Sequence, residues 1–398
     1  MISDYEKIVT GRDKSIFAGD IVANENTLRE SVRGSRIAIV GAAGSIGSAV
    51  ARTILRFKPA SLSLVDLNEN NLVEVVRDLR SSTDVTLPED FAELPIGLGT
   101  IEFDRYFQES KPFDYFLNLS AIKHVRSEKN IYCLMRMIDT NAVFLYDFLS
   151  QNPYHFRKVF SVSSDKAANP ANMMGASKMV MEKVLLNQSE VQPFSTTRFA
   201  NVAFSDGSLP YGFLQRVRKQ QAISAPNDVK RYFISHQEAG EMCVLSCVLG
   251  KNRDVFFPKL ARDKDEKTFS QIALDLLESL GYETVECDSE DEAKSRTNEL
   301  IPKKKWPCYF SKSDTTGEKA YEEFYVEDEK LDMDRYRNIG VIKRDANVEE
   351  EPLKAFINFC REAKANSFVT KDDYVQAMRA IVPDLRHMET GNNLDNKM

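Results

Sequence analysis

The sequence lacks the long apolar runs that would place it in a membrane. No stretch of its 398 residues approaches the roughly 20 apolar residues that a membrane-spanning helix requires. The N-terminal stretch has early acidic residues and no apolar signal core, which is not typical of a secreted protein. Cations are also in deficit: the net charge is −7 and the pI is near 5.4, whereas a duplex nucleic-acid binder usually has a basic face. We therefore expect a cytoplasmic protein with neither a membrane nor a nucleic acid as partner.

The six cysteines lack the paired spacing that holds a structural metal ion. Cys243 and Cys247 lie one helical turn apart beside Met242, Val244 and Leu245. This apolar setting favours thiols buried in the core over metal ligands. We expect no metal site and a reducing compartment. The sequence also shows no internal repeat and no low-complexity block.

What the sequence does contain is an alternation of short apolar runs and helical stretches. The apolar runs are typical of strands buried on both faces of a sheet, and they cover residues 37–40, 62–65, 115–119 and 159–162. The helical stretches cover residues 45–57, 68–80, 131–150 and 173–187. Strand–helix alternation at these lengths predicts an α/β fold with a Rossmann-type, doubly wound parallel sheet.

The pattern changes along the chain and predicts four regions. Residues 1–33 are polar and are expected to form an N-terminal helical cap, and residues 34–200 form the sheet domain. Residues 201–300 mix polar loops with helices, so we expect a smaller, mostly helical substrate-binding region, with 261–300 helical. Residues 301–398 are a C-terminal extension, in which the pattern predicts helices over 349–365 and 370–381.

A glycine-rich turn follows the first predicted strand and opens a helix. Its candidate cofactor-binding residues are Gly41, Gly44, Ser45, Ile46 and Gly47. The Gly-x-x-Gly-x-x-Gly spacing allows a tight turn and brings a helix N-terminus, with free N–H groups, to a pyrophosphate. The strand before it and the helix after it distinguish this motif from a glycine turn without a ligand.

An acid at the end of the second predicted strand, Asp66, indicates which dinucleotide binds. Its carboxylate can accept hydrogen bonds from both hydroxyls of an adenosine ribose. No Arg or Lys immediately follows it to neutralise a 2′-phosphate, so we predict NAD rather than NADP. Asn118, Ser120 and Ala121 end a further strand, where small side chains would let the cofactor cross the edge of the sheet.

A reactive cluster follows the fourth predicted strand. It reads Ser163-Ser164-Asp165-Lys166 and then Asn172-Met173-Met174-Gly175-Ala176-Ser177-Lys178. This run resembles the signature of nucleotide-sugar 4,6-dehydratases in the polysaccharide-biosynthesis branch of the extended short-chain dehydrogenases, above all the UDP-N-acetylglucosamine 4,6-dehydratases. In short-chain dehydrogenases a Tyr stands at the position of Met174, and one subgroup of the dehydratases carries Met there. The resemblance covers roughly residues 34–260.

The resemblance implies that NAD takes a hydride from carbon 4 of the sugar, that water is eliminated across carbons 5 and 6, and that the hydride returns to carbon 6. It also implies that Asp165 is the acid at the carbon 6 oxygen and Lys166 the base at carbon 5. A base requires that the pKa of Lys166 fall well below its usual value, which burial and nearby Lys178 favour and an ion pair with Asp165 opposes.

The missing Tyr leaves the carbon 4 hydroxyl without its usual proton acceptor, because Met174 has no ionisable proton. Ser164 is the candidate acceptor, with Lys178 polarising the network of ribose and substrate hydroxyls. We assign Met174 a role in shaping the pocket.

Further candidates for holding the nucleotide sugar lie at strand ends and in loops: Lys123, His124, Asn201, Arg231 and Lys259. Arg231 can pair with a phosphate in fork geometry. Arg198 and Asn201 fall at the end of a later strand, where the ligands of such sheets collect. Lys123 and His124 are expected to line the sugar pocket.

The sequence leaves the nucleotide and the exact reaction open. The same chemistry on GDP-N-acetylglucosamine, in a legionaminic-acid type route, is one alternative. An epimerase shares the fold but returns the hydride to carbon 4, and the Asp165-Lys166 pair argues against it. A non-catalytic nucleotide-sugar sensor that has lost its Tyr is another. In each case we expect a homo-oligomer.

Overall fold

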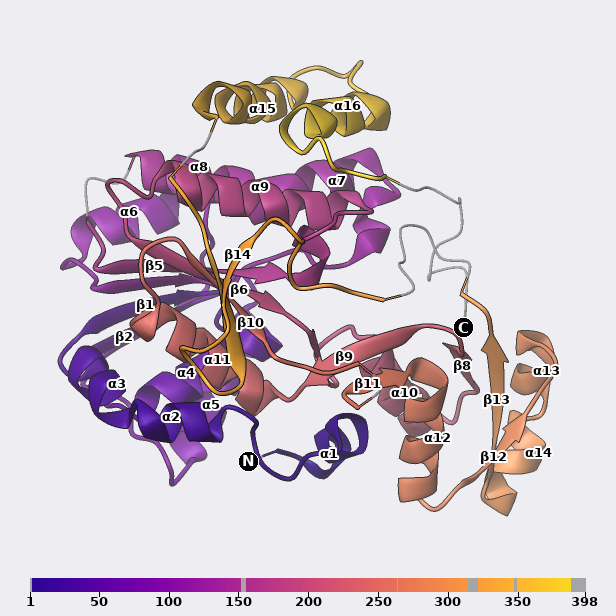
Figure 1. Ribbon diagram of the computed structural model, residues 1–398. Helices are drawn as coiled ribbons and strands as arrows, with labels where there is room; N and C mark the ends of the chain where they lie inside the picture. Colours follow the sequence, from indigo (N-terminus) through magenta and orange to yellow (C-terminus); the bar gives the residue numbers. More distant parts are fainter. Residues whose placement is uncertain (1, 152–154, 263, 314–320, 347–348, 388–398) are drawn as a thin grey trace.

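A nine-stranded sheet forms the centre of the computed structural model, which describes residues 2–151, 155–262, 264–313, 321–346 and 349–387. Its strand order is β14-β15-β10-β6-β5-β4-β1-β2-β3 (Figure 1). The strands from β3 to β10 are parallel, and β15 and β14 add an antiparallel edge. The chain order reverses between β1 and β4, the switch point at which doubly wound sheets bind ligands. The predicted α/β fold is confirmed.

The four strands predicted from apolar runs are all present. They are β1 (Arg36–Val40), β2 (Ser61–Val65), β4 (Tyr115–Asn118) and β5 (Lys158–Ser164). The rest of the sheet consists of β3 (Asp90–Leu94), β6 (Phe194–Phe199), β10 (Asp254–Pro258), β14 (Lys330–Asp332) and β15 (Ile339–Lys343). The β14–β15 edge was not among the predicted strands, and β14 has only three residues and no apolar run.

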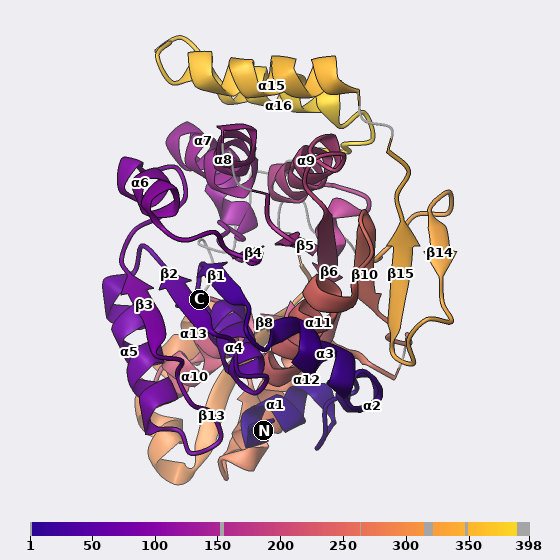
Figure 2. The ribbon, with the colours of Figure 1, turned by 90° about the vertical axis from the view of Figure 1, so that its left-hand side faces the viewer.

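Helices cover both faces of the sheet (Figure 2). One face packs against α3 (Glu25–Val32), α4 (Ser45–Leu55), α5 (Glu69–Ser81) and α11 (His236–Leu249). The short helices α1 (Asp4–Thr10) and α2 (Ala18–Ala23) precede them. The other face packs against α6 (Ile101–Glu109), α7 (Ile131–Ile138), α8 (Phe144–Gln151) and α9 (Met173–Asn187). A π-helical turn, η2 (Asp139–Val143), joins α7 to α8.

A C-terminal helix pair adds a further layer outside α9 (Figure 1). It consists of α15 (Glu350–Ala363) and α16 (Lys371–Ile381), close to the predicted ranges. Leu353 and Phe356 from α15 and Met378 from α16 share one apolar core with Val180 and Val184 of α9. The pair is therefore packed onto the sheet domain through α9.

A smaller lobe lies beside the carboxyl ends of the parallel strands (Figure 1). Its helices are α10 (Leu209–Arg218), α12 (Phe269–Ser279), α13 (Glu290–Ser295) and α14 (Thr297–Leu300), followed by the 3-10 turn η4 (Ile301–Lys303). Its two small sheets are β11-β9-β7 and β12-β13-β8. Their strands are β7 (Asn201–Val202), β8 (Ile223–Pro226), β9 (Lys230–Ile234), β11 (Glu266–Thr268), β12 (Glu283–Glu286) and β13 (Lys305–Ser311).

The expectation that residues 261–300 are helical throughout was wrong at two places, because β11 and β12 interrupt them. Both strands are short, rich in charge and partly exposed, so they offer no apolar run from which a strand could be read. Trp306, the single Trp of the sequence, is fully buried at the centre of this lobe.

Within the described residues, no helix combines the length and the apolar character needed to cross a membrane. Cys243 and Cys247 are buried in α11, as expected of core thiols.

Candidate functional site

The glycine-rich turn between β1 and α4 has the geometry of a ligand cradle. Gly41 has a φ of 79°, and a Cβ there would lie 2.5 Å from the Ser120 nitrogen. A Cβ on Gly47 would lie 2.1 Å from the Gly41 oxygen, so α4 packs directly on the turn. Gly44 differs: its Cβ would meet only the Gly41 oxygen, at 3.6 Å, an ordinary contact. The packing of the protein itself therefore does not require glycine at position 44, and a bare backbone there leaves room for a ligand to approach the turn.

The start of α4 is suited to an anion. Gly44 is its N-cap, and no side chain caps the first N–H groups, which belong to Ser45, Ile46 and Gly47. Unpaired N–H groups and the positive end of the helix dipole favour a phosphate at this place. The Ser45 hydroxyl donates to the Asp206 carboxylate at 3.0 Å, and the Asp206 N–H donates back to it at 2.9 Å. Asp206 had not been singled out in the sequence.

Asp66 is fixed beside this turn by the main chain. It accepts hydrogen bonds from the N–H groups of Ala43 at 2.9 Å and Asn68 at 2.9 Å. Each carboxylate oxygen retains a further lone pair, so the two oxygens can still accept bonds from ribose hydroxyls. The residues around the turn fit a dinucleotide.

At the end of β4, the predicted cofactor residues play different parts. The Asn118 side chain is buried; its oxygen accepts from the Ser120 hydroxyl at 2.6 Å and its amide donates to Ser161 at 3.2 Å. It therefore joins β4 to β5 and orients the loop. Ala121, three residues further along the chain, is exposed.

The reactive cluster lies where β5 ends and the short 3-10 turn η3 (Asp165–Ala167) begins. The Ser164 hydroxyl donates to Asp165 Oδ1 at 2.7 Å, and Lys166 Nζ lies 3.2 Å from the same oxygen. A Cβ on Gly175 would lie 2.4 Å from the Lys166 carbonyl oxygen. Glycine at this position therefore allows η3 to pack against α9. The structure brings Ser164, Asp165 and Lys166 together as one connected group.

A residue that sequence reasoning missed, Glu322, completes this group. Its Oε1 lies 3.3 Å from Lys166 Nζ and 3.8 Å from Arg231 Nε. Burial acts to lower the pKa of Lys166, but the carboxylates of Asp165 and Glu322 outweigh it and hold that pKa above the usual value. The ion pair that disfavours loss of the Lys166 proton is therefore present, and it involves two carboxylates, those of Asp165 and Glu322, rather than one.

Helix α9 presents the other half of the cluster. The Asn172 side chain caps it by accepting from the Gly175 N–H at 2.8 Å. Met174 is buried, and its N–H donates to Glu128 at 3.1 Å. Lys178, one helical turn further on, donates from Nζ to the Val162 carbonyl of β5 at 3.0 Å. Burial lowers the pKa of Lys178 to about 8, against the opposing charge of Glu182.

Arg198 has a structural rather than a ligand-binding geometry. It is fully buried, and its guanidinium pairs with Glu182 at 2.9 Å and Glu329 at 3.0 Å. Arg344 pairs with Glu329 at 2.6 Å, closing a network that joins β6, α9 and the segment ahead of β14. The interpretation of Arg198 as a ligand-contacting residue is corrected, because its position at a strand end said nothing about these buried partners.

The predicted substrate residues fall into two groups. Lys123 donates to Ser205 at 3.3 Å, and a Cβ on Gly207 would lie 2.8 Å from the His124 ring, so both border the loop next to the glycine-rich turn. Asn201 donates from its amide to the Tyr232 carbonyl at 3.3 Å, in the strand pair that carries Arg231. Arg231 is buried and faces Lys166 across Glu322.

Lys259 stands apart from these residues. Its ammonium contacts three main-chain carbonyls between residues 333 and 337, of Met333, Tyr336 at 2.6 Å and Arg337 at 3.3 Å. This geometry favours a role in holding the loop before β15 over the predicted contact with a diphosphate.

Comparisons with known proteins place the chain in a family. The sequence profile of a family described as polysaccharide biosynthesis protein matches residues 37–344. An uncharacterized membrane protein of Methanocaldococcus jannaschii is 24% identical over 77% of this chain and 85% of its own length. The capsular polysaccharide biosynthesis protein CapD of Staphylococcus aureus is 28% identical over 55% of this chain and 37% of its own length. A UDP-glucose 4-epimerase of Rickettsia typhi is 26% identical over 56% of this chain and 65% of its own length. The chain thus spans less than half of CapD.

Solved structures share the fold. Pen from Bacillus thuringiensis superposes with a TM-score of 0.60 and 20% identity, covering 80% of this chain and 90% of that chain. DesIV, a dTDP-glucose 4,6-dehydratase from Streptomyces venezuelae with NAD and TYD bound, gives a TM-score of 0.54 and 16% identity. The superposition covers 83% of this chain and 98% of DesIV.

Proposed function

The chain belongs to the family of polysaccharide biosynthesis proteins, and from its site we propose that it is an NAD-dependent 4,6-dehydratase of UDP-N-acetylglucosamine. The family, together with epimerases and a dehydratase among its relatives and structural neighbours, supports an enzyme acting on a nucleotide sugar. The choice of a dehydratase rests on one observation: the Ser164–Asp165–Lys166 group, in which Asp165 Oδ1 lies 2.7 Å from a hydroxyl and 3.2 Å from an ammonium. Elimination of water needs an acid and a base next to each other, and this group supplies both.

The glycine-rich turn, Asp66 and Lys178 are the residues that would hold NAD. Bound there, NAD would supply the reversible removal of a hydride from carbon 4 of the sugar and its return to carbon 6. The NAD carried by DesIV, which shares this fold, supports the choice of cofactor.

The hydrogen bond between Ser164 and Asp165 suggests how one proton serves two steps. As carbon 4 is oxidised, the Ser164 hydroxyl takes the proton of the carbon 4 hydroxyl and passes its own proton to Asp165 Oδ1. Asp165 is then the neutral acid that donates this proton to the oxygen leaving carbon 6, and water departs. This relay replaces the proton transfer for which Met174 has no group.

Neutral Lys166 takes the proton from carbon 5 and later returns it there, after the hydride has reached carbon 6. Once Lys166 has released its resting proton to solvent, every group of the protein ends in the state in which it entered these steps, and the product is a 4-keto-6-deoxy sugar. This role requires that Lys166 lose its proton before the elimination, against the two carboxylates that face it.

The proposal is tested by incubating the purified full chain and NAD with UDP- or GDP-N-acetylglucosamine and recording product masses. We expect UDP-N-acetylglucosamine to lose the mass of one water. Asp165→Asn, which cannot shuttle the proton, should lower the rate by about 10²–10⁴-fold. Asp372→Asn is the matched control, because Asp372 is exposed in the first turn of α16, in the layer outside α9.

The alternatives give different products. Loss of water from the GDP sugar alone would move the assignment to that nucleotide. An isomer of unchanged mass would identify an epimerase. Binding without turnover, equal in Asp165→Asn and the unmodified protein, would identify a sensor and refute the enzyme.

A further inference from the structure

The carboxylate of Glu322 occupies the space between two cations that the proposed reaction needs. It is 5% exposed, with Oε1 at 3.3 Å from Lys166 Nζ and 3.8 Å from Arg231 Nε. Its other oxygen, Oε2, is buried and has no hydrogen-bond partner among the described residues. A buried carboxylate oxygen without a donor is costly, so its retention calls for an explanation.

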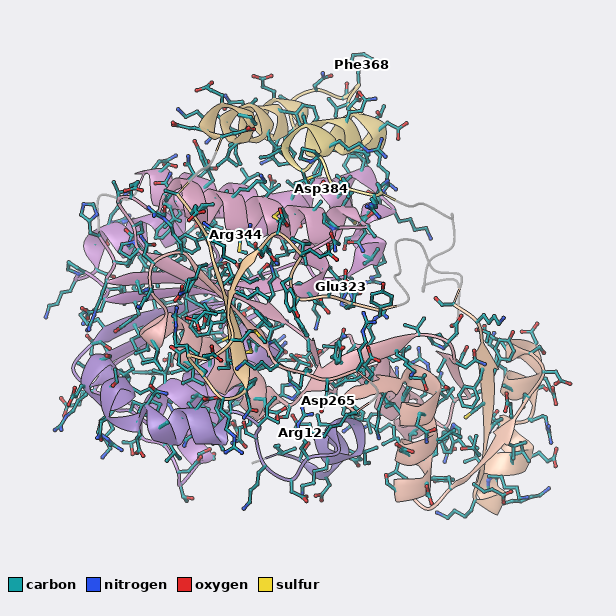
Figure 3. All side chains as sticks on the ribbon, in the orientation of Figure 1. Arg12, Asp265, Glu323, Arg344, Phe368 and Asp384 are labelled. Atoms are coloured by element: carbon teal, nitrogen blue, oxygen red, sulfur yellow. The ribbon has the colours of Figure 1, made fainter. Side chains whose placement is uncertain are left out.

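The segment that carries Glu322 is built into the molecule rather than loosely apposed. It runs between α9 and β9 (Figure 1), and the neighbouring Glu323, labelled in Figure 3, accepts from Asn169 at 2.9 Å. The Phe324 ring lies 5.6 Å from that of Tyr232, and the Phe324 carbonyl accepts from Arg198 Nη1 at 2.9 Å. The contact between Glu322 and the two cations is thus defined by its surroundings.

This arrangement conflicts with catalysis if it persists when the substrate is bound. Among the described residues, the charged groups that face Lys166 are Asp165, Glu322 and Arg231, and the two carboxylates keep Lys166 protonated. The proposed base must be neutral. The diphosphate expected at Arg231 would also approach the negative charge of Glu322, and like charges at such distances repel strongly in a buried site.

Both conflicts disappear if Glu322 moves. We propose that Glu322 is a positioning residue that covers Lys166 and Arg231 in the free protein and withdraws from both when the diphosphate of a nucleotide sugar pairs with Arg231. The withdrawal removes one of the two carboxylates beside Lys166, so the base becomes available only when substrate is present. This inference rests on the proposed function for the role of Lys166, while the competition at Arg231 does not depend on it.

The competition is measured by titrating UDP into the NAD-loaded full chain in a calorimeter. Glu322→Gln keeps the shape of the side chain and removes its charge, so UDP should bind about ten-fold more tightly, the effect of one like charge removed at close range. Glu323→Gln is the matched control, since its carboxylate faces Asn169 instead, and it should leave UDP binding unchanged. Glu322→Ala is measured in parallel, so that the result does not depend on the behaviour of one variant.

The release of Lys166 is measured by the pH dependence of turnover. The profile of kcat/KM reports the free enzyme and that of kcat reports the substrate complex. In Glu322→Gln the rising limb of kcat/KM should move down by about one pH unit, because a neighbouring carboxylate has been lost. The rising limb of kcat should not move, because Glu322 has already left Lys166 in the complex.

The outcomes separate this inference from the proposed function. Weaker or unchanged UDP binding by both Glu322 variants would overturn the proposed withdrawal of Glu322. Equal shifts of the rising limbs of the kcat/KM and kcat profiles would overturn it as well. Tighter UDP binding by the variants, in a protein that releases no water from either nucleotide sugar, refutes the dehydratase and retains the competition at Arg231.

Discussion

Two glycines of the turn between β1 and α4 are expected to respond in opposite ways to the addition of one methyl group. In Gly47→Ala the new Cβ would start 2.1 Å from the Gly41 oxygen, so α4 must move by about 1.3 Å to restore an ordinary 3.4 Å contact. Overpacking of this kind costs about 1–3 kcal/mol, which lowers the melting temperature of a protein of this size by a few degrees. In Gly44→Ala the methyl group meets only one atom, at 3.6 Å, and stability should change by less than about 1 kcal/mol.

Gly44→Ala, which should hardly change the stability, is expected to weaken NAD binding. At an NAD concentration of about 100 times Kd, binding stabilises the unmodified protein by about 2.7 kcal/mol. If the methyl group of Gly44→Ala obstructs the pyrophosphate and weakens binding about 100-fold, the same concentration adds only about 0.4 kcal/mol. Thermal unfolding with and without NAD measures both quantities. A Gly44→Ala variant that keeps the full NAD-induced increase in melting temperature would refute the assignment of this turn to a dinucleotide.

The buried ion network yields two further predictions. Replacing Arg198 with Met leaves Glu182 and Glu329 buried without their fully buried cation, and urea unfolding should show a loss of about 3–5 kcal/mol. Arg344 lies at the half-buried rim of the network, so Arg344→Met should lower the free energy of unfolding by only about 1 kcal/mol. Equal losses in the two variants would contradict the assignment of most of the stabilisation to Arg198. Burial acts to raise the pKa of Glu182, but Arg198 outweighs it and lowers that pKa from 4.5 to about 2. The stabilisation from this depressed pKa is complete above pH 4.5 and is lost as the pH falls toward 2. Unfolding followed by circular dichroism should therefore show a free energy of unfolding that declines across this range. A free energy of unfolding that stays constant would contradict the lowered pKa of Glu182.

The sheet domain could be predicted because its signals are local. Parallel strands buried on both faces read as continuous apolar runs, and the glycine spacing, Asp66 and the Ser164–Lys166 run are each contained in a few consecutive residues. The part of the site that sequence reasoning missed depends on contacts across the chain. Glu322 reaches Lys166 from a segment without periodic pattern, and no residue type near it signals that contact.

Arg198 shows the converse error. A basic residue at a strand end suggests a ligand, but its carboxylate partners lie on α9 and ahead of β14, and only the folded chain brings them to it. Lys259 was likewise predicted to contact a ligand, but its ammonium donates to main-chain carbonyls between residues 333 and 337. The sequence indicates which charged groups are present, and tertiary packing decides which of them are available to contact a ligand.

The two borders of the nine-stranded sheet limit how copies of this chain can associate. One border is β14, only three residues long and carrying Lys330 and Asp332; the other is β3, whose Asp90 and Glu93 are charged and outward. Short and charged borders resist the strand-to-strand docking that underlies fibre formation. Any homo-oligomer would then form through helical surfaces, and its interface should survive substitutions along either border.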